Sequence, residues 1–209
     1  MDAPRYSLTN RQAGRHIAIS LQVKRLVQEC CPECGVYVAT YTAGRSGQAY
    51  QRIEEQSGEE FWSIKAWTGP PYRRLKDPDV LVTAGERVRF AVEVKWGAVE
   101  SSTRTDLEVS RAEWARMEDL FLSPALCRVR GPAVQAGRRY RSTEFAVERD
   151  YRVDGETRLV LVTDVARMQC LLGPACRDVL RSWQQAGPRI LLADIDSRVE
   201  DIPALRELL

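Results

Sequence analysis

The sequence predicts an α/β protein whose core is a central mixed β-sheet flanked by helices. Three observations favour this class. Apolar residues recur at helical spacing over residues 9–30. Short β-branched and aromatic runs of strand length follow, and a strand–helix–strand order near the C-terminus is consistent with parallel pairing. With 209 residues, of which 44% are hydrophobic, the chain is long enough to form one domain around its own core.

The first part of the chain predicts a long helix and then alternating strands and helices. The helix over residues 9–30 presents an apolar stripe of Ile19, Val23, Leu26 and Cys30, with Ile17 and Leu21 beside it. The run VYVATYT predicts a strand at residues 36–42, SGQAYQRIEEQSG predicts a helix at 46–58, and FWSIKAW predicts a strand at 61–67.

Residues 78–97, PDVLVTAGERVRFAVEVKWG, predict two strands joined by a turn. Strand alternation places Glu93 and Lys95 on one face of the second strand and the neighbouring valines on the other. Burying valine, alanine and phenylalanine does not require a lysine at this position. The charges therefore indicate a role beyond folding.

The C-terminal half predicts further strands and helices. Ser110 and Glu113 form a capping box for a helix at residues 110–122. The runs TEFAVERDYRV and ETRLVLVTD predict two strands in a hairpin around the Asp-Gly pair at 154–155. A helix at 174–186, the strand RILLADI and the closing helix IPALRELL complete the pattern.

The charged residues around the central turn suit a metal-assisted reaction. Asp79 lies at the start of the first strand, and its carboxylate and that of Glu93 would make an oxygen-rich site for Mg²⁺ or Mn²⁺. Lys95 adds a positive charge for a phosphate or an activated water. Metal, water and phosphate together indicate phosphodiester hydrolysis. The alternative is a structural hairpin in which Lys95 forms a salt bridge with a nearby acid.

These residues resemble the motif of the restriction-endonuclease-like nuclease superfamily, which has Pro-Asp, a variable gap, and then Asp or Glu, any residue, and Lys. Here the motif reads Pro78-Asp79 and Glu93-Val94-Lys95. The resemblance implies that Asp79 and Glu93 bind the metal and that Lys95 is catalytic.

The resemblance covers about residues 45–165 and implies a nuclease core at the centre of a single domain. Residues 1–44 then form a helical extension with a Cys-x-x-Cys turn, and residues 166–209 form a strand–helix–strand extension.

Members of this superfamily often add a metal-binding glutamate from an upstream helix. Glu54 and Glu55 lie on the helix predicted at residues 46–58, and Glu54 is favoured because it borders the apolar face. The alternative is a solvated acidic helix end. Asp77 is an alternative to Asp79 as the metal-binding aspartate. A residue before proline is pushed toward an extended conformation, so Asp77 fits only the position at which the chain enters the strand.

Basic residues in two segments indicate contact with nucleic acid, and the resemblance implies DNA. Residues 128–141, RVRGPAVQAGRRYR, hold five arginines and no acid, and their glycines and proline predict a loop. A second basic cluster directly precedes the motif. The predicted phosphate-binding residues are Arg73, Arg74, Lys76, Arg128, Arg130, Arg138, Arg139 and Arg141. Because the net charge is only +2, an ordinary solvated loop is the alternative.

Cys31 and Cys34 form a CPEC turn of the kind that supplies two thiolates to Zn²⁺. A structural zinc needs four ligands and a second short cysteine pair is absent, so a helix ending in a Cys-Pro turn without metal is the alternative. The only histidine, His16, lies within the helical pattern. Nothing in the sequence indicates that it activates a nucleophile, which argues against cysteine–histidine pairs and serine triads.

Together these features predict a Mg²⁺- or Mn²⁺-dependent nuclease, with a DNA endonuclease as the first choice. Two other classes stay open. One is a non-catalytic nucleic-acid-binding or assembly protein with a nuclease-like fold, and the other is an interaction module stabilised by zinc at Cys31 and Cys34.

The sequence also bears on location and assembly. No apolar run is long enough to span a membrane, and the N-terminus lacks a recognisable secretion signal. A cytoplasmic location is therefore expected. A homodimer is expected only by analogy with nucleases that cut both strands.

Overall fold

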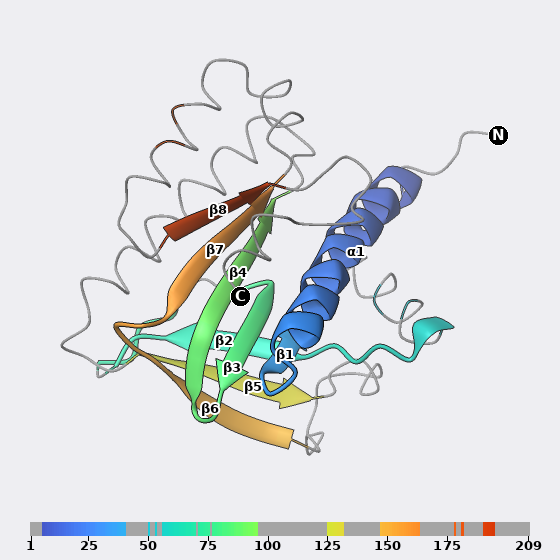
Figure 1. The fold of residues 1–209 in the computed structure, drawn as a ribbon. Helices are drawn as coiled ribbons and strands as arrows, with labels where there is room; N and C mark the ends of the chain where they lie inside the picture. Colours follow the sequence, from blue (N-terminus) through green and yellow to red (C-terminus); the bar gives the residue numbers. More distant parts are fainter. Residues whose placement is uncertain are drawn as a thin grey trace.

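One long helix and one β-sheet make up the fold of this computed structural model. The described residues are 6–40, 50, 53, 56–69, 71–75, 77–95, 125–131, 147–163, 178, 181 and 190–194. Helix α1 spans Tyr6–Cys30, and the eight strands within this part of the chain belong to a single mixed sheet (Figure 1). The predicted α/β class with a mixed sheet is therefore confirmed for the described residues.

Helix α1 ends at Cys30, as predicted, and begins three residues earlier than the periodicity indicates. Its stripe from Ile17 to Leu26 is buried, whereas Cys30 is exposed. Cys30 was wrongly assigned to the stripe because Val27 takes the inward position in the last turn.

Strands β3 (Val80–Ala84) and β4 (Arg87–Lys95) form the predicted hairpin. Gly85 lies in the turn between them with φ of 58°, a conformation that glycine adopts readily. Strand β1 (Gly35–Val38) pairs antiparallel with the other edge of β3. The hairpin that carries the motif is thus held on both sides.

Strands β7 (Arg158–Thr163) and β8 (Ile190–Asp194) continue the sheet beyond β4, and both pair in parallel. The predicted hairpin around residues 154–155 is wrong. Strand β6 (Val147–Val153) and β7 do not pair with each other; both run parallel to β4, one after the other. The nine-residue β4 is long enough to offer its edge to each of them in turn.

Strand β5 (Ala125–Gly131) shows that the loop prediction for residues 128–141 is wrong at residues 128–131. It pairs antiparallel with β6 and with β2 (Ser63–Trp67). Its buried positions alternate with the arginines, which is the pattern of a strand with one buried face. Residues 132–141 lie outside the described part of the chain.

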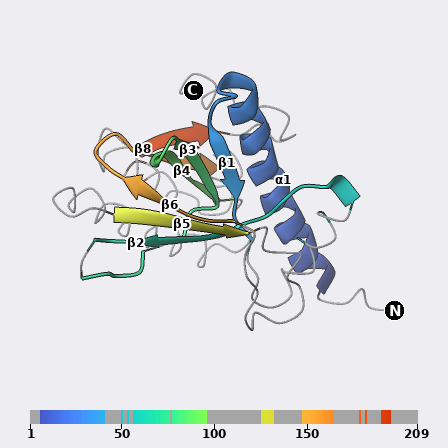
Figure 2. The ribbon, with the colours of Figure 1, turned by 90° about the horizontal axis from the view of Figure 1, so that it is seen from below.

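The sheet curls back on itself. It runs from β1 through β3, β4, β6 and β5 to β2, and a single bridge between Ala39 and Trp62 joins the end of β1 to the start of β2. Figures 1 and 2 show α1 lying along one side of this curved sheet.

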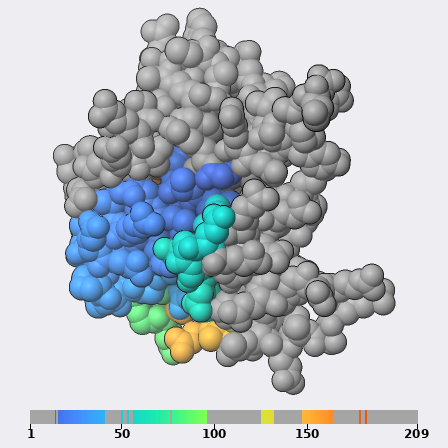
Figure 3. All heavy atoms as spheres, turned by 90° about the vertical axis from the view of Figure 1, so that its right-hand side faces the viewer, coloured from blue at the N-terminus to red at the C-terminus, as the bar shows by residue number. Residues whose placement is uncertain are grey.

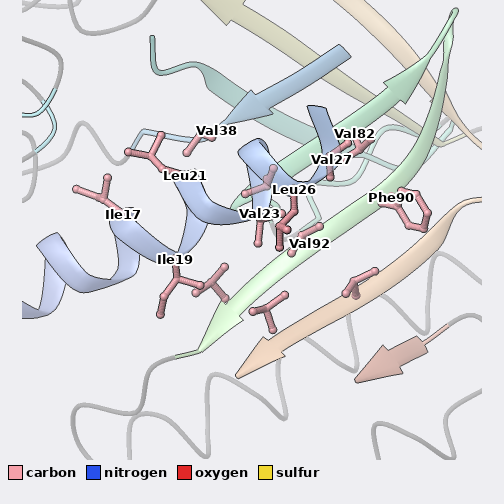
Figure 4. Packing of buried hydrophobic residues seen from close by; sticks show 14 of the residues in the cluster. Ile17, Ile19, Leu21, Val23, Leu26, Val27, Val38, Val82, Phe90 and Val92 are labelled. Atoms are coloured by element: carbon pink, nitrogen blue, oxygen red, sulfur yellow. The ribbon is translucent and has the colours of Figure 1, made fainter. Parts of the chain in front are cut away.

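One apolar cluster fills the space between α1 and the sheet. Figure 4 shows Val23 and Leu26 of the helix beside Val92 of β4, with Ile19 nearer the end of the same strand. Burying a side chain of this size stabilises the fold by about 1.5–3 kcal/mol. This packing fixes α1 across the end of β4 that carries the motif.

A second cluster lies on the opposite face of the sheet, inside its curl. Leu81, Ala91 and Leu161 belong to it, together with Tyr151 from β6. Strand β4 therefore sends successive residues to two different cores. A hydrogen bond of 2.5 Å between the hydroxyl groups of Tyr37 and Tyr151 joins β1 to β6 across the inside of the curl.

Several predicted elements fall partly or wholly outside the described residues. The helix at 110–122 and the closing helix at 202–209 do so entirely, whereas residues 50, 53, 56 and 57 are helical within the predicted 46–58 segment. Lys24 on α1 forms an ion pair of 2.5 Å with Glu59, which follows that segment. Figure 3 shows the surface of α1, in blue, beside the surface of the chain around Glu59, in teal. Across the described ranges, no helix is both long and apolar enough to traverse a membrane.

Candidate functional site

Asp79 is held in place by the backbone of two neighbouring segments, strand β4 and the residue that follows β1. Its N–H donates to the Val92 carbonyl at 2.9 Å, and its own carbonyl accepts from Ala39 at 2.8 Å. Its Oδ2 accepts the Val94 N–H at 2.6 Å. The side chain is therefore fixed beside β4, on which the other motif residues lie.

The backbone bonds of Asp79 bring the two motif carboxylates to neighbouring positions. The antiparallel pairing of β3 with β4 ends with Val80 opposite Val92. Asp79, one residue earlier, bonds to the Val92 carbonyl and to the Val94 N–H, and these two residues lie on either side of Glu93. The sequence pattern alone predicted the spacing of these residues, and these bonds supply their neighbourhood.

Glu93 and Lys95 lie on one face, as strand alternation predicts, while Val92 and Val94 pack toward α1. The Lys95 Nζ is 2.7 Å from the Glu93 Oε1. The Thr163 hydroxyl donates to the Lys95 carbonyl at 2.9 Å and fixes the end of the strand. The salt bridge considered as a structural alternative is thus present.

His16 joins this group from α1, and sequence reasoning missed it. Its Nε2 is 3.3 Å from the Asp79 Oδ2. Burial lowers the pKa of His16, but the charge of Asp79 and the hydrogen bond to it outweigh this effect, so that the pKa is raised overall. Lys95 lowers the same pKa and Glu93 raises it by smaller amounts.

One signal in the sequence could have pointed to His16. It precedes Ile19 and Val23 by three and seven residues, which continues the inward-facing stripe of α1 by one turn. A polar residue at the end of a buried stripe needs a partner, but the sequence does not reveal which acid supplies it.

Tyr50 lies close to the same carboxylate. It is buried and packs edge-on against Phe61 with ring centroids 4.9 Å apart. Burial raises the pKa of the Tyr50 hydroxyl, and the negative charge of Asp79 raises it further. Tyr50 thus comes from the segment that also contains Glu54, which itself lies outside the described residues.

The two motif carboxylates do not face open solvent. Asp79 is 2% exposed and Glu93 is 0% exposed. The side chains of His16 and Lys95 contact them and remain 23% and 12% exposed. The two nitrogen-bearing side chains are therefore more exposed than the two acids that they contact.

The donor set of Asp79 and Glu93 fits a hard divalent cation in its chemistry, since both offer carboxylate oxygens. Two carboxylates are fewer protein ligands than Ca²⁺ takes, but Mg²⁺ usually keeps several waters and needs only one or two. Glu54 would add a third carboxylate. Asp79 and Glu93 are therefore suitable for Mg²⁺ or Mn²⁺.

Asp77 belongs to a different group of contacts. Its Oδ2 lies 3.0 Å from the Lys65 Nζ and 2.5 Å from an Arg74 nitrogen, and its Oδ1 accepts the Ala66 N–H at 3.2 Å. These contacts tie the chain before Pro78 to β2. Asp79, and not its rival, contacts the motif strand.

The predicted phosphate-binding arginines are largely paired with acids. Arg128 contacts Asp150 at 2.6 and 2.7 Å, and Arg130 contacts Glu148 at 2.8 Å, each across the β5–β6 pairing. Arg74 pairs with Asp77, whereas Arg73 is an exposed residue. The other predicted residues, Lys76, Arg138, Arg139 and Arg141, lie outside the described part of the chain.

A separate cluster lies where α1 meets β1. The ligand atoms of Cys31, Glu33 and Cys34 all lie within 4.8 Å of one another. Among the described residues, this is the one group of three His, Cys, Asp or Glu side chains that meets this condition. Burial raises the pKa of Cys34, while a hydrogen bond from Arg89 opposes that shift.

Comparison with family models, curated proteins and solved structures found no match to this chain. The functional interpretation therefore rests on the residues and their geometry.

Proposed function

We propose that this protein is a Mg²⁺- or Mn²⁺-dependent nuclease that hydrolyses phosphodiester bonds, with DNA as its substrate. The observation that carries the proposal is the bonding of Asp79 to β4. Asp79 bonds to the backbone of Val92 and Val94, the residues on either side of Glu93. The Lys95 Nζ lies 2.7 Å from the Glu93 carboxylate.

Asp79 and Glu93 are the proposed metal ligands, with Glu54 as a third. When bound, the cation would polarise the scissile phosphate and lower the pKa of a water molecule. The Val94 N–H and His16 both contact the Asp79 Oδ2, which fixes how this carboxylate is oriented. The backbone and α1 thus preorganise one ligand.

Lys95 is the proposed catalytic residue. Its ammonium group lies 2.7 Å from the Glu93 carboxylate, and its side chain is 12% exposed, whereas Glu93 is buried. A compact ammonium on a flexible stem can pass from a carboxylate to a phosphate. There it stabilises the charge that develops in the transition state.

A purely structural role explains this ion pair less well. Taking two charges out of water costs free energy that their attraction often fails to recover, so a buried ion pair is weak evidence for stability. Glu93 is fully buried, and its partner across the β4–β7 pairing, Leu161, belongs to the second apolar cluster. A function that needs these charges accounts for their presence.

The test is cleavage of plasmid and oligonucleotide DNA by the purified protein with Mg²⁺, with Mn²⁺ and with a chelator. Wild-type protein should cut only with metal, and Lys95→Ala should lower the rate by about 10²–10³-fold. Lys65→Ala is the matched control, because Lys65 pairs with Asp77 outside the cluster.

The two outcomes separate the nuclease from its nearest rival. DNA binding without any cutting by the wild-type protein, unchanged in Lys95→Ala, would identify a non-catalytic binding protein. Equal loss of cleavage in Lys65→Ala and Lys95→Ala would contradict the proposed catalytic role of Lys95.

A further inference from the structure

We propose that Cys31, Glu33 and Cys34 bind a divalent cation of the kind that accepts thiolate ligands, such as Zn²⁺. The Arg89 side chain contacts the two sulfurs of this site. This site is distinct from the carboxylate cluster and does not depend on nuclease activity.

The end of α1 builds the ligand arrangement. The Cys31 N–H still donates to the Val27 carbonyl at 2.7 Å, and the Cys34 N–H turns back to the Cys31 carbonyl at 3.0 Å. This tight turn brings both sulfurs to the same side, where Cys31 and Cys34 are buried. Glu33 lies between them in sequence and is exposed, so its carboxylate approaches from the solvent side.

A β-bulge directs Arg89 at this turn. Val82 pairs with Phe90 and Thr83 with Val88, which leaves Arg89 as the extra residue of β4. Bulges commonly re-aim a side chain. As a result Arg89 reaches the same side of the sheet as Phe90, and its guanidinium lies 3.1 Å from the Cys31 sulfur and 3.7 Å from the Cys34 sulfur.

The charges of this group balance when a dication is present. Two thiolates and one carboxylate carry three negative charges, and a dication reduces the sum to one. The Arg89 guanidinium then neutralises the remainder. N–H groups that contact ligand atoms outside the coordination shell are a regular part of metal sites. Arg89 is therefore placed as a supporting donor to the metal-bound sulfurs.

Three protein ligands leave one position of a tetrahedral ion for water. This number differs from the four protein ligands of a closed structural zinc site. The missing second cysteine pair in the sequence is thus compatible with metal binding.

Metal binding here would fasten the end of α1 to the sheet. Cys31 and Cys34 belong to the apolar cluster between α1 and the strands, and Arg89 belongs to β4. An ion that binds the folded state and not the unfolded chain raises stability by mass action. We expect Zn²⁺ to raise Tm by about 5–10 °C at roughly a hundredfold excess over Kd.

The experiment is a titration of the reduced, metal-free full chain with Co²⁺, followed by competition with Zn²⁺. Wild-type protein should show thiolate-to-cobalt charge-transfer absorption that saturates at one equivalent and is abolished by Zn²⁺. Cys31→Ser and Cys34→Ser should each lose at least about half of this absorption, because each removes one of two thiolates. Glu33→Gln should weaken the affinity about 10-fold or more and keep the absorption.

Cys30→Ser is the matched control, because Cys30 is the neighbouring cysteine and is exposed. It should bind Co²⁺ and Zn²⁺ as the wild type does. Absence of charge-transfer absorption in the folded wild-type protein would overturn the proposal, and so would a loss in Cys30→Ser equal to that in Cys31→Ser. The wild-type titration answers the question even if a cysteine variant fails to fold.

Discussion

The contact between His16 and Asp79 joins α1 to the motif hairpin through single side chains. His16 is the only histidine in the chain, so its signals in an NMR spectrum need no assignment by mutation. The charges of Glu93 and Lys95 also act on its pKa, in opposite directions. The ionisation of His16 therefore reports on the whole charged cluster.

We expect NMR titration to give His16 a pKa above the ordinary value of about 6.5, because the Asp79 carboxylate outweighs the effect of burial. Asp79→Asn should lower this pKa, since burial and Lys95 then act with less opposition. Asp77→Asn should leave it unchanged, because Asp77 contacts Lys65 and Arg74 instead. A wild-type pKa at or below the ordinary value would contradict the described contact.

The Glu93–Lys95 ion pair predicts a particular pattern of stability. Lys95→Met should destabilise the protein by about 3–5 kcal/mol, because it removes the cation from a buried carboxylate. The double variant Glu93→Gln/Lys95→Met should recover most of this loss while remaining inactive. Urea unfolding measures both effects. A double variant as unstable as the single one would show that the two charges are not coupled.

Single residues show both the reach and the limit of sequence reasoning. The shared face of Glu93 and Lys95 follows from the two-residue period of a strand, and the structure confirms it. The partner of His16 does not follow from any local rule, because it depends on how α1 crosses the sheet. The burial of Asp79 and Glu93 likewise depends on tertiary packing.

Among the elements, the β1–β3 pairing depends on a close approach at Gly35. A Cβ at this position would lie 2.6 Å from the Thr83 hydroxyl oxygen. We expect Gly35→Ala to destabilise the protein by about 1–3 kcal/mol, because β1 or Thr83 must move. Gly14→Ala in α1 is the matched control; a Cβ there would meet none of the described residues within 4 Å, and the change should stabilise by about 0.5–1 kcal/mol. Thermal unfolding of the two variants compares them, and a neutral Gly35→Ala would contradict this packing.

The turn between β6 and β7 depends on an ion pair with β4. The Arg87 Nε lies 2.6 Å from the Asp154 Oδ2, and this hydrogen bond, opposed by burial, holds the pKa of Asp154 below its ordinary value. Because the folded-state pKa is lowered, the stabilisation is complete above the unfolded-state pKa and is lost as pH falls through the folded-state value.

Asp154→Asn should therefore be less stable than the wild type near neutral pH, and the difference should shrink as pH falls below about 4. Denaturant unfolding at several pH values measures this convergence. Glu156→Gln is the control, since Glu156 is exposed and should contribute little. A difference between Asp154→Asn and wild type that is constant with pH would contradict the assigned pKa direction.

The elements also show why one pairing was predicted wrongly. An Asp-Gly pair between two strand patterns favours a hairpin, but the same turn can bend the chain between two strands that run in one direction. The choice is made by the edge of β4, which pairs with β6 at Arg87 and with β7 from Phe90 onward. Strand β5 was missed for a similar reason, because its arginines pair with acids of β6 rather than forming a loop.

At the scale of the whole molecule, the curled sheet separates two apolar clusters and places the charged group where α1 passes β3 and β4. The mixed sheet and the long helix could be predicted from hydrophobic periodicity. The curl could not, because it depends on pairings between strands distant in sequence, such as β2 with β5. The net charge of +2 gives no bulk attraction for nucleic acid, so the proposed binding of DNA would depend on local groups.

The most direct test of the central claim compares two aspartates that flank Pro78. Single-turnover DNA cleavage with Mg²⁺ should fall by at least about 100-fold in Asp79→Asn, because this carboxylate lies beside Glu93 and Lys95. Asp77→Asn, checked for folding by circular dichroism, should retain cleavage within a few-fold of wild type. Cleavage by Asp79→Asn at the wild-type rate would contradict the assignment of the carboxylate cluster as the active site.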